Sequence, residues 1–88
     1  MIKSTLTICN KAGLHARAAA RMVSVSSAFD SQIQVGEDKL VDGKSILSLM
    51  MLAASKGTVL NILIEGPDES AALEAITALV NNRFDESE

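Results

Sequence analysis

Apolar side chains alternate with polar ones near the start of the chain, which predicts a half-buried first strand. Ile2, Leu6 and Ile8 are apolar, whereas Lys3 and Thr5 are polar. Residues 10–13 then break the alternation and predict a loop that contains Gly13. The opening pattern is therefore a strand followed by a loop.

A helix is predicted from Ala16 onward. The segment ARAAARMV is rich in strong helix formers, and Ala18, Met22 and Val25 fall on one face at helical spacing. We expect this helix to end between Ser27 and Phe29.

The middle of the chain predicts two strands, a second helix and a further strand. Residues 32–35 and 40–42 have strand composition and are separated by a hairpin turn. Ser45 is placed to cap a helix over the run ILSLMMLAA, and Gly57 follows Lys56 as at a helix end. Residues 59–65 again have strand composition.

A third helix is predicted near the end of the chain, over residues 69–82, with Asp68 as its cap. Its apolar stripe consists of Leu73, Ile76, Leu79 and Val80. The order β-α-β-β-α-β-α predicts an α/β (α+β) fold, a two-layer open-faced β-sandwich. We expect a four-stranded antiparallel sheet with three helices on one face, forming a single domain over residues 1–88.

Composition narrows the possible functions. The chain has 88 residues, of which 48% are hydrophobic and 22% charged, and a net charge of −3 without Trp or Tyr. No concentrated basic patch or aromatic platform indicates nucleic-acid binding. No apolar run approaches the length of a membrane span or a signal peptide, so we expect a cytoplasmic protein without membrane insertion. One Cys and one His cannot form a multi-ligand metal site, and we expect neither metal nor organic cofactor.

His15 is the strongest candidate for chemistry. It lies between the glycine loop and the first helix, where free N–H groups and the helix dipole favour an anion beside a nucleophilic ring nitrogen. Arg17 adds a planar cation suited to phosphate oxygens. The alternative is a surface histidine that only helps to cap the helix. The scattered carboxylates, including Asp68, Asp85 and the glutamates, are interpreted as capping and solubilising groups.

Two segments resemble the HPr family, the histidine-containing phosphocarriers of the bacterial phosphotransferase system. NKAGLHARAAARM is similar to that family's phosphorylation-site segment, and GKSILSLMMLAASKGT is similar to its second signature. The resemblance covers essentially the whole chain and implies that His15 is phosphorylated and that Arg17 steadies the phosphoryl group. The family commonly has a proline directly after the arginine, where this chain has Ala18. MMLAASKG and NNRFDESE are similar to the nitrogen-related NPr branch, so the branch stays open.

The resemblance also implies partners and a mode of action. Enzyme I would donate the phosphoryl group and an Enzyme IIA-type protein would accept it, so the chain is a carrier and not a stand-alone enzyme. Ser45 corresponds to a serine that an HPr kinase/phosphorylase modifies in some bacteria, although a plain N-cap is the simpler interpretation of the residue. The alternative function is a regulatory binding module switched by phosphorylation at Ser45 or His15.

The second helix predicts a docking surface, because it is apolar nearly all round. Leu49, Leu52 and Ala53 suit the core, which leaves Ile46, Leu47 and Met50 exposed for partners. The alternative is a more deeply buried helix with a second apolar neighbour. Ala16 and Ala20 on the first helix are predicted to lie on the same docking surface, and we expect a monomer.

Overall fold

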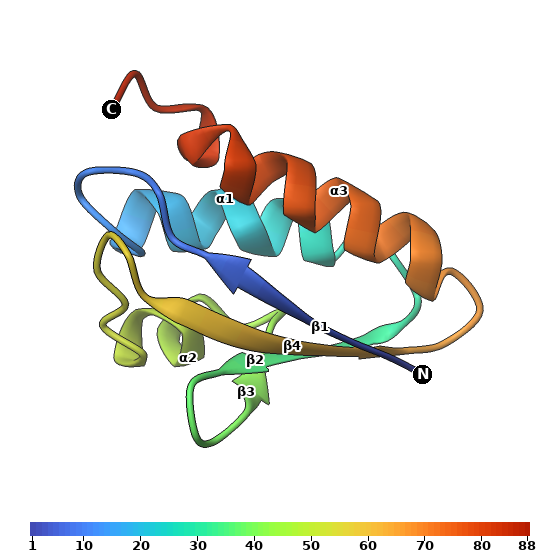
Figure 1. Ribbon diagram of the computed structural model, residues 1–88. Coiled ribbons are helices and arrows are strands. Elements are labelled where there is room, and N and C mark those ends of the chain that lie inside the picture. Colours follow the sequence, from blue (N-terminus) through green and yellow to red (C-terminus); the bar gives the residue numbers. More distant parts are fainter.

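A computed structural model describes residues 1–88 and contains one antiparallel sheet with three helices on one face (Figure 1). The strand order across the sheet is β1-β4-β2-β3. The elements are β1 (Ile2–Thr7), α1 (Ala16–Ser26), β2 (Gln32–Gly36), β3 (Val41–Asp42), α2 (Ile46–Met51), β4 (Val59–Glu65), α3 (Glu69–Asn81) and the short 3-10 helix η1 (Arg83–Asp85). The predicted fold class and element order are confirmed.

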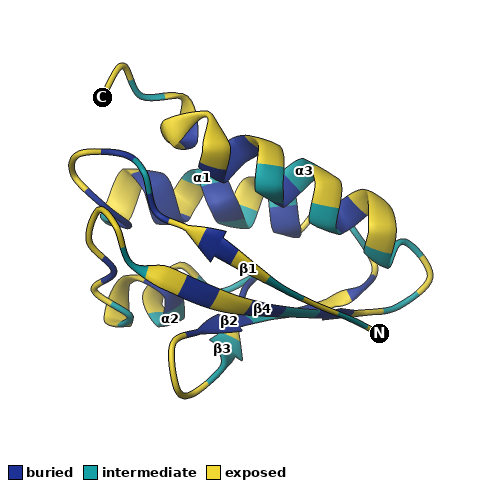
Figure 2. Ribbon diagram, in the orientation of Figure 1, coloured by how far each residue is buried: buried dark blue, intermediate teal, exposed yellow.

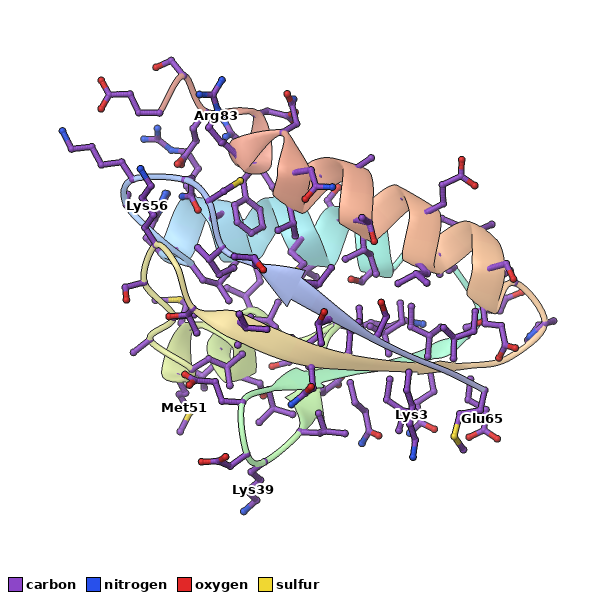
Figure 3. The ribbon with its side chains drawn as sticks, viewed as in Figure 1. Lys3, Lys39, Met51, Lys56, Glu65 and Arg83 are labelled. Carbon is purple, nitrogen blue, oxygen red and sulfur yellow. The ribbon has the colours of Figure 1, made fainter.

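Alternation along the strands divides the sheet into a buried face and an open face. Leu60, Ile62 and Ile64 of β4 are buried beneath the helices. Lys3 and Glu65 project from the sheet on the side away from α1 and α3 (Figure 3). Burying one large aliphatic side chain contributes about 1.5–3 kcal/mol. Eighteen buried apolar residues form a single cluster, so the core between sheet and helices dominates the stability of the fold.

Helices α1 and α3 lie side by side over the buried face (Figure 1). Each presents a stripe of buried residues, and the rest of its circumference is exposed or half-buried (Figure 2). On α1 the stripe contains Ala18 and Met22, as predicted, whereas Val25 is only half-buried. On α3 it contains Ile76 and Val80. Small alanines on α1 allow that helix to approach its neighbours closely.

Helix α2 is shorter than its composition predicted. It ends at Met51, and Ala53 adopts a φ of 50°, a left-handed conformation that does not continue a helix. Gly57 does not end the helix but donates its N–H to the carbonyl of Ile8 at 2.7 Å, just before β4. The expectation that Ala53 lies in the core is wrong, because this turn places it at the surface. Leu49 is fully buried, as expected.

Asp68 precedes α3, but its carboxylate does not cap the helix, so this part of the prediction is wrong. The carboxylate instead accepts hydrogen bonds from the N–H groups of Asp30 and Ser31, each at 2.9 Å, and from the Ser31 hydroxyl. The bond from the Ser31 side chain, followed by that from the Asp30 N–H, lowers the pKa of Asp68 below its usual value. Asp68 therefore ties the start of α3 to the loop before β2.

The tail after α3 turns sharply and returns to the loop that precedes α1. Arg83, Phe84 and Asp85 have φ angles of 55°, 52° and 63°. Left-handed backbone costs a non-glycine residue roughly 1–2 kcal/mol. Complete burial of the Phe84 ring offsets this cost, and Arg21 donates a hydrogen bond to the Phe84 carbonyl. Figure 1 shows the C-terminal tail at the same end of the molecule as the loop before α1.

Candidate functional site

The loop before α1 is held in place by the turn that follows α2. The N–H of Leu14 donates to the carbonyl of Ala54 at 2.8 Å. Gly13 has a φ of +73°, and a Cβ atom at this position would lie 2.5 Å from the Ala54 oxygen. Only glycine combines this backbone conformation with so close an approach. The loop therefore delivers His15 to a fixed position at the start of α1.

His15 is the N-cap residue of α1, with extended backbone angles and an imidazole ring that folds over the first turn. Its Nδ1 atom accepts a hydrogen bond from the Arg17 N–H at 3.1 Å. An atom that accepts from an N–H must carry a lone pair and no proton. The ring is 31% exposed, so one side of it is open to a partner.

Charged side chains of both signs lie beside the ring. Lys11, Arg17 and Arg21 line one open depression together with His15, and three carboxylates line it too: Asp85, Glu86 and Glu88. Arg21 binds the Phe84 carbonyl, and Lys11 forms an ion pair with Glu88 at 3.3 Å. The Arg17 guanidinium forms no hydrogen bond or ion pair within the protein. Of the three cations, Arg17 is therefore the one whose side chain is free to bind an anion at this site.

The first turn of α1 also offers free backbone donors. The earliest intrahelical bond runs from the Ala19 N–H to the His15 carbonyl at 2.8 Å, and the amides of Ala16 and Ala18 form no backbone hydrogen bond. Such N–H groups, aligned with the positive end of the helix dipole, favour an anion. The donors that the sequence predicted at this helix start are present.

Two site residues were missed by the sequence interpretation. The carboxylate of Glu86 lies with Oε2 at 2.5 Å from His15 Nε2, and its Oε1 accepts from Asn10 Nδ2 at 2.8 Å. The Asn10 bond, with smaller contributions from His15 and Arg21, lowers the pKa of Glu86, although partial burial opposes the shift. The view of the glutamates as solubilising groups is wrong for Glu86. The one feature of the sequence that could have indicated the position of Glu86 is Phe84, an apolar residue whose burial in the core holds the tail against the fold.

The predicted docking residues are exposed. Ile46, Leu47 and Met50 of α2 are 42%, 69% and 41% exposed, and Ala16 and Ala20 lie on the open side of α1. Met51, which the sequence interpretation did not include, is 76% exposed and points away from the molecule beneath α2 (Figure 3). Leu52 is half-buried against the core. Within this chain no second apolar element buries α2, so the alternative of a more deeply buried helix is wrong.

Ser45 caps α2. Its Oγ accepts a hydrogen bond from the Ser48 N–H at 3.3 Å. This geometry accounts for the serine without any modification, and phosphorylation of Ser45 stays a prediction.

Neither a metal cluster nor a membrane-crossing helix is found. No group of three or more His, Cys, Asp or Glu side chains is arranged to hold a metal ion. None of the helices combines the length and the apolar character needed to span a bilayer.

Comparison with known proteins links this site to one family. Residues 2–82 match the model of the family described as the PTS HPr component phosphorylation site. The phosphocarrier protein HPr of Pseudomonas aeruginosa is 54% identical over 85 residues, 94% of each chain, and that of Neisseria meningitidis is 47% identical over all of both chains. A crystal structure of HPr from Thermoanaerobacter tengcongensis superposes over the full length of both chains with a TM-score of 0.94 at 44% identity. The tail that contains Glu86 lies beyond the residues that the family model matches.

Proposed function

The chain belongs to the HPr family, the phosphocarriers of the phosphotransferase system, and from this premise we propose that Nδ1 of His15 is the atom that carries the phosphoryl group. The function as a phosphocarrier follows from the family, and the alternative of a purely regulatory module is not favoured. The assignment to one atom is our inference from the site.

One observation carries the assignment: Nδ1 holds its lone pair at the start of a helix, directed at the Arg17 N–H. A nucleophile needs an available electron pair, and the hydrogen bond to Nδ1 requires one. The other ring nitrogen, Nε2, faces the Glu86 carboxylate and is closed to an incoming group. The geometry therefore favours Nδ1 over Nε2.

The surrounding donors suit the group that is transferred. As Nδ1 bonds to phosphorus, the phosphoryl oxygens would replace Nδ1 as the partner of the Arg17 N–H. The unpaired amides of Ala16 and Ala18 lie in the same first turn, and the free Arg17 guanidinium can form two parallel bonds to phosphate oxygens. Phosphoryl transfer depends chiefly on such positioning and charge stabilisation. These groups would therefore stabilise both the transition state and the phosphorylated protein.

Membership of the family indicates the class of partner but not the individual proteins. Members of this family exchange a phosphoryl group with other proteins of the phosphotransferase system. We infer that Enzyme I is the donor and an Enzyme IIA-type protein the acceptor, and that the exchange takes place in the cytoplasm. The exposed apolar side chains Ile46, Leu47 and Met50, with Ala16 and Ala20, are the surface that we expect both partners to cover. The protein would thus act as a carrier, since each partner supplies part of the reaction site.

A transfer experiment tests the proposal. Wild-type protein incubated with Enzyme I and labelled phosphoenolpyruvate should gain an acid-labile, base-stable label and pass it to an Enzyme IIA-type acceptor. The variant His15→Ala should gain none, because no second histidine exists to carry the group. Ser45→Ala is the matched control and should be labelled like wild type. Labelling of His15→Ala at the wild-type level would overturn the assignment.

A further inference from the structure

We propose that Glu86 is a positioning residue for phosphoryl uptake: its carboxylate holds the Nε2 proton of His15 and stabilises the positive charge that the ring acquires. The proposal rests on the proposed function, in which Nδ1 of His15 is the nucleophile. It adds a role for the tail after α3, which comes 71 residues later in the chain than His15.

The carboxylate is held by both of its oxygens. Oε2 lies 2.5 Å from His15 Nε2, and Oε1 accepts from Asn10 Nδ2 at 2.8 Å. Asn10 is itself fully buried, and its Nδ2 donates a second bond to the Gly13 carbonyl at 2.8 Å. Both partners of this amide nitrogen are acceptors, so the orientation of the Asn10 side chain is fixed. Glu86 is thereby fastened to the same loop that positions His15.

The tail is anchored on both sides of Glu86. Before it, the Phe84 ring is buried in the core and the Phe84 carbonyl accepts a bond from Arg21. After it, Glu88 pairs with the Lys11 ammonium at 3.3 Å and its carbonyl accepts from the Lys11 N–H. The left-handed backbone of residues 83–85 turns the chain toward the ring. The contact with His15 is therefore part of an organised segment and not a loose end of the chain.

The charge of Glu86 fits this role. Its lowered pKa keeps the carboxylate ionised at neutral pH, so it can only accept a hydrogen bond. Nε2 must then donate, which agrees with the lone pair that the Arg17 N–H requires on Nδ1. A carboxylate that fixes the tautomer and orientation of a reacting histidine acts in the same way in other histidine-dependent sites.

The transfer step shows where the charge arises. The electron pair of Nδ1 forms the new bond to phosphorus, and the bond between phosphorus and the donor nitrogen breaks, with its electron pair returning to the donor. No proton moves, and the Nε2 proton stays between the ring and Glu86. The ring becomes positively charged as the bond forms, 2.5 Å from a negative carboxylate. Glu86 therefore stabilises the transition state of uptake through His15 without touching the phosphoryl group.

The test compares Glu86→Gln with Glu74→Gln, which removes the same charge from the exposed surface of α3. Single-turnover uptake from phosphorylated Enzyme I at saturating donor should slow about tenfold to a hundredfold in Glu86→Gln, by analogy with the loss of a carboxylate that orients a metal-binding histidine. Glu74→Gln should stay within about twofold of wild type, because Glu74 is exposed on α3 and contacts neither the ring nor the tail. In wild-type protein, proton NMR should detect a downfield Nε2-bound proton protected from water, and Glu86→Gln should lose that protection.

The outcomes separate this inference from the function on which it rests. Equal uptake rates and an equally protected Nε2 proton in Glu86→Gln and Glu74→Gln would overturn the role of Glu86 and leave His15 as the carrier. Incorporation of the phosphoryl label into the His15→Ala variant would overturn the assignment of His15 as the carrier. Amide NMR spectra of each variant establish that the fold is intact, so a slow Glu86→Gln with native spectra supports a positioning role.

Discussion

Helices α1 and α2 begin with the same capping arrangement in different surroundings. In each, the cap side chain accepts a hydrogen bond from a backbone N–H of the first turn: His15 from Arg17 at 3.1 Å and Ser45 from Ser48 at 3.3 Å. Neither first turn contains an acidic residue. The positive end of a helix dipole is therefore available at both sites.

The surroundings separate the two sites. Beside His15 lie three cations and three carboxylates, of which Glu86 contacts the ring, and Arg17 is the cation whose side chain has no partner of its own. Beside Ser45, the adjacent Lys44 is occupied by the Phe29 carbonyl at 2.7 Å, and the side chains that follow are exposed and apolar. A helix start alone thus does not make a phosphoryl site. The difference comes from a nucleophile with an available lone pair and a cation that is free to bind the transferred group.

The largest expected effect on stability separates the two faces of α2. Leu49 is fully buried, so Leu49→Ala should lower the free energy of unfolding by about 2–5 kcal/mol through the cavity it leaves. Leu47 is exposed, so Leu47→Glu should change it by no more than about 0.5 kcal/mol. The same Leu47→Glu should weaken binding to Enzyme I, because a charge would be desolvated against the partner. Chemical denaturation and titration of both variants measure this. If Leu47→Glu is destabilised and Leu49→Ala is not, the assignment of the buried and exposed faces of α2 is wrong.

A smaller effect tests whether the free cation distinguishes the α1 site. Arg17→Lys keeps the charge but loses the planar fork, so phosphoryl uptake should slow by about tenfold to a thousandfold, the cost of one preorganised donor. Arg83→Lys makes the same exchange on the exposed tail and should leave the rate unchanged. Single-turnover kinetics give both rates. An Arg17→Lys rate equal to that of Arg83→Lys would mean that the helix N–H groups suffice without the guanidinium.

The smallest effect tests whether Ser45 acts only as a cap. Ser45→Ala removes the bond to the Ser48 N–H and should lower the free energy of unfolding by about 0.5–2 kcal/mol. Ser45→Asp restores an acceptor that favours the N-cap position, so its stability should return to near the wild-type value. Denaturation curves of the two variants measure the difference. Equal destabilisation by Ala and Asp would show that the hydroxyl does more at this position than accept one hydrogen bond.

Local pattern was sufficient to predict most of the fold. The sequence pattern located the four strands and the three α-helices but not the short helix η1, and the buried positions of β4 and α3 follow the periods of a strand and a helix. It overestimated the length of α2, since the left-handed turn at Ala53 depends on tertiary bonds to the loop before α1, such as that from Leu14 to Ala54. Propensity favours helix for such an alanine, and tertiary structure overrides it.

The candidate site was only half predictable. His15 and Arg17 are adjacent in sequence and share one helix start, so spacing and family resemblance both indicate them. Glu86 joins them through a tail that returns across the fold, and no local pattern encodes that return. Asp68 shows the same limit: it occupies a cap position, but its oxygens bind a loop that is distant in sequence. Contacts of high sequence separation need the assembled structure.

The phosphorylated atom can be identified from an NMR spectrum of the ¹⁵N-labelled protein after phosphorylation by Enzyme I and phosphoenolpyruvate. We expect one phosphorus–nitrogen coupling, on Nδ1 of His15, with a proton retained on Nε2, because only Nδ1 has a lone pair directed at open helix donors. Phosphorus on Nε2 of His15, or on the Ser45 hydroxyl in place of the ring, would contradict this expectation.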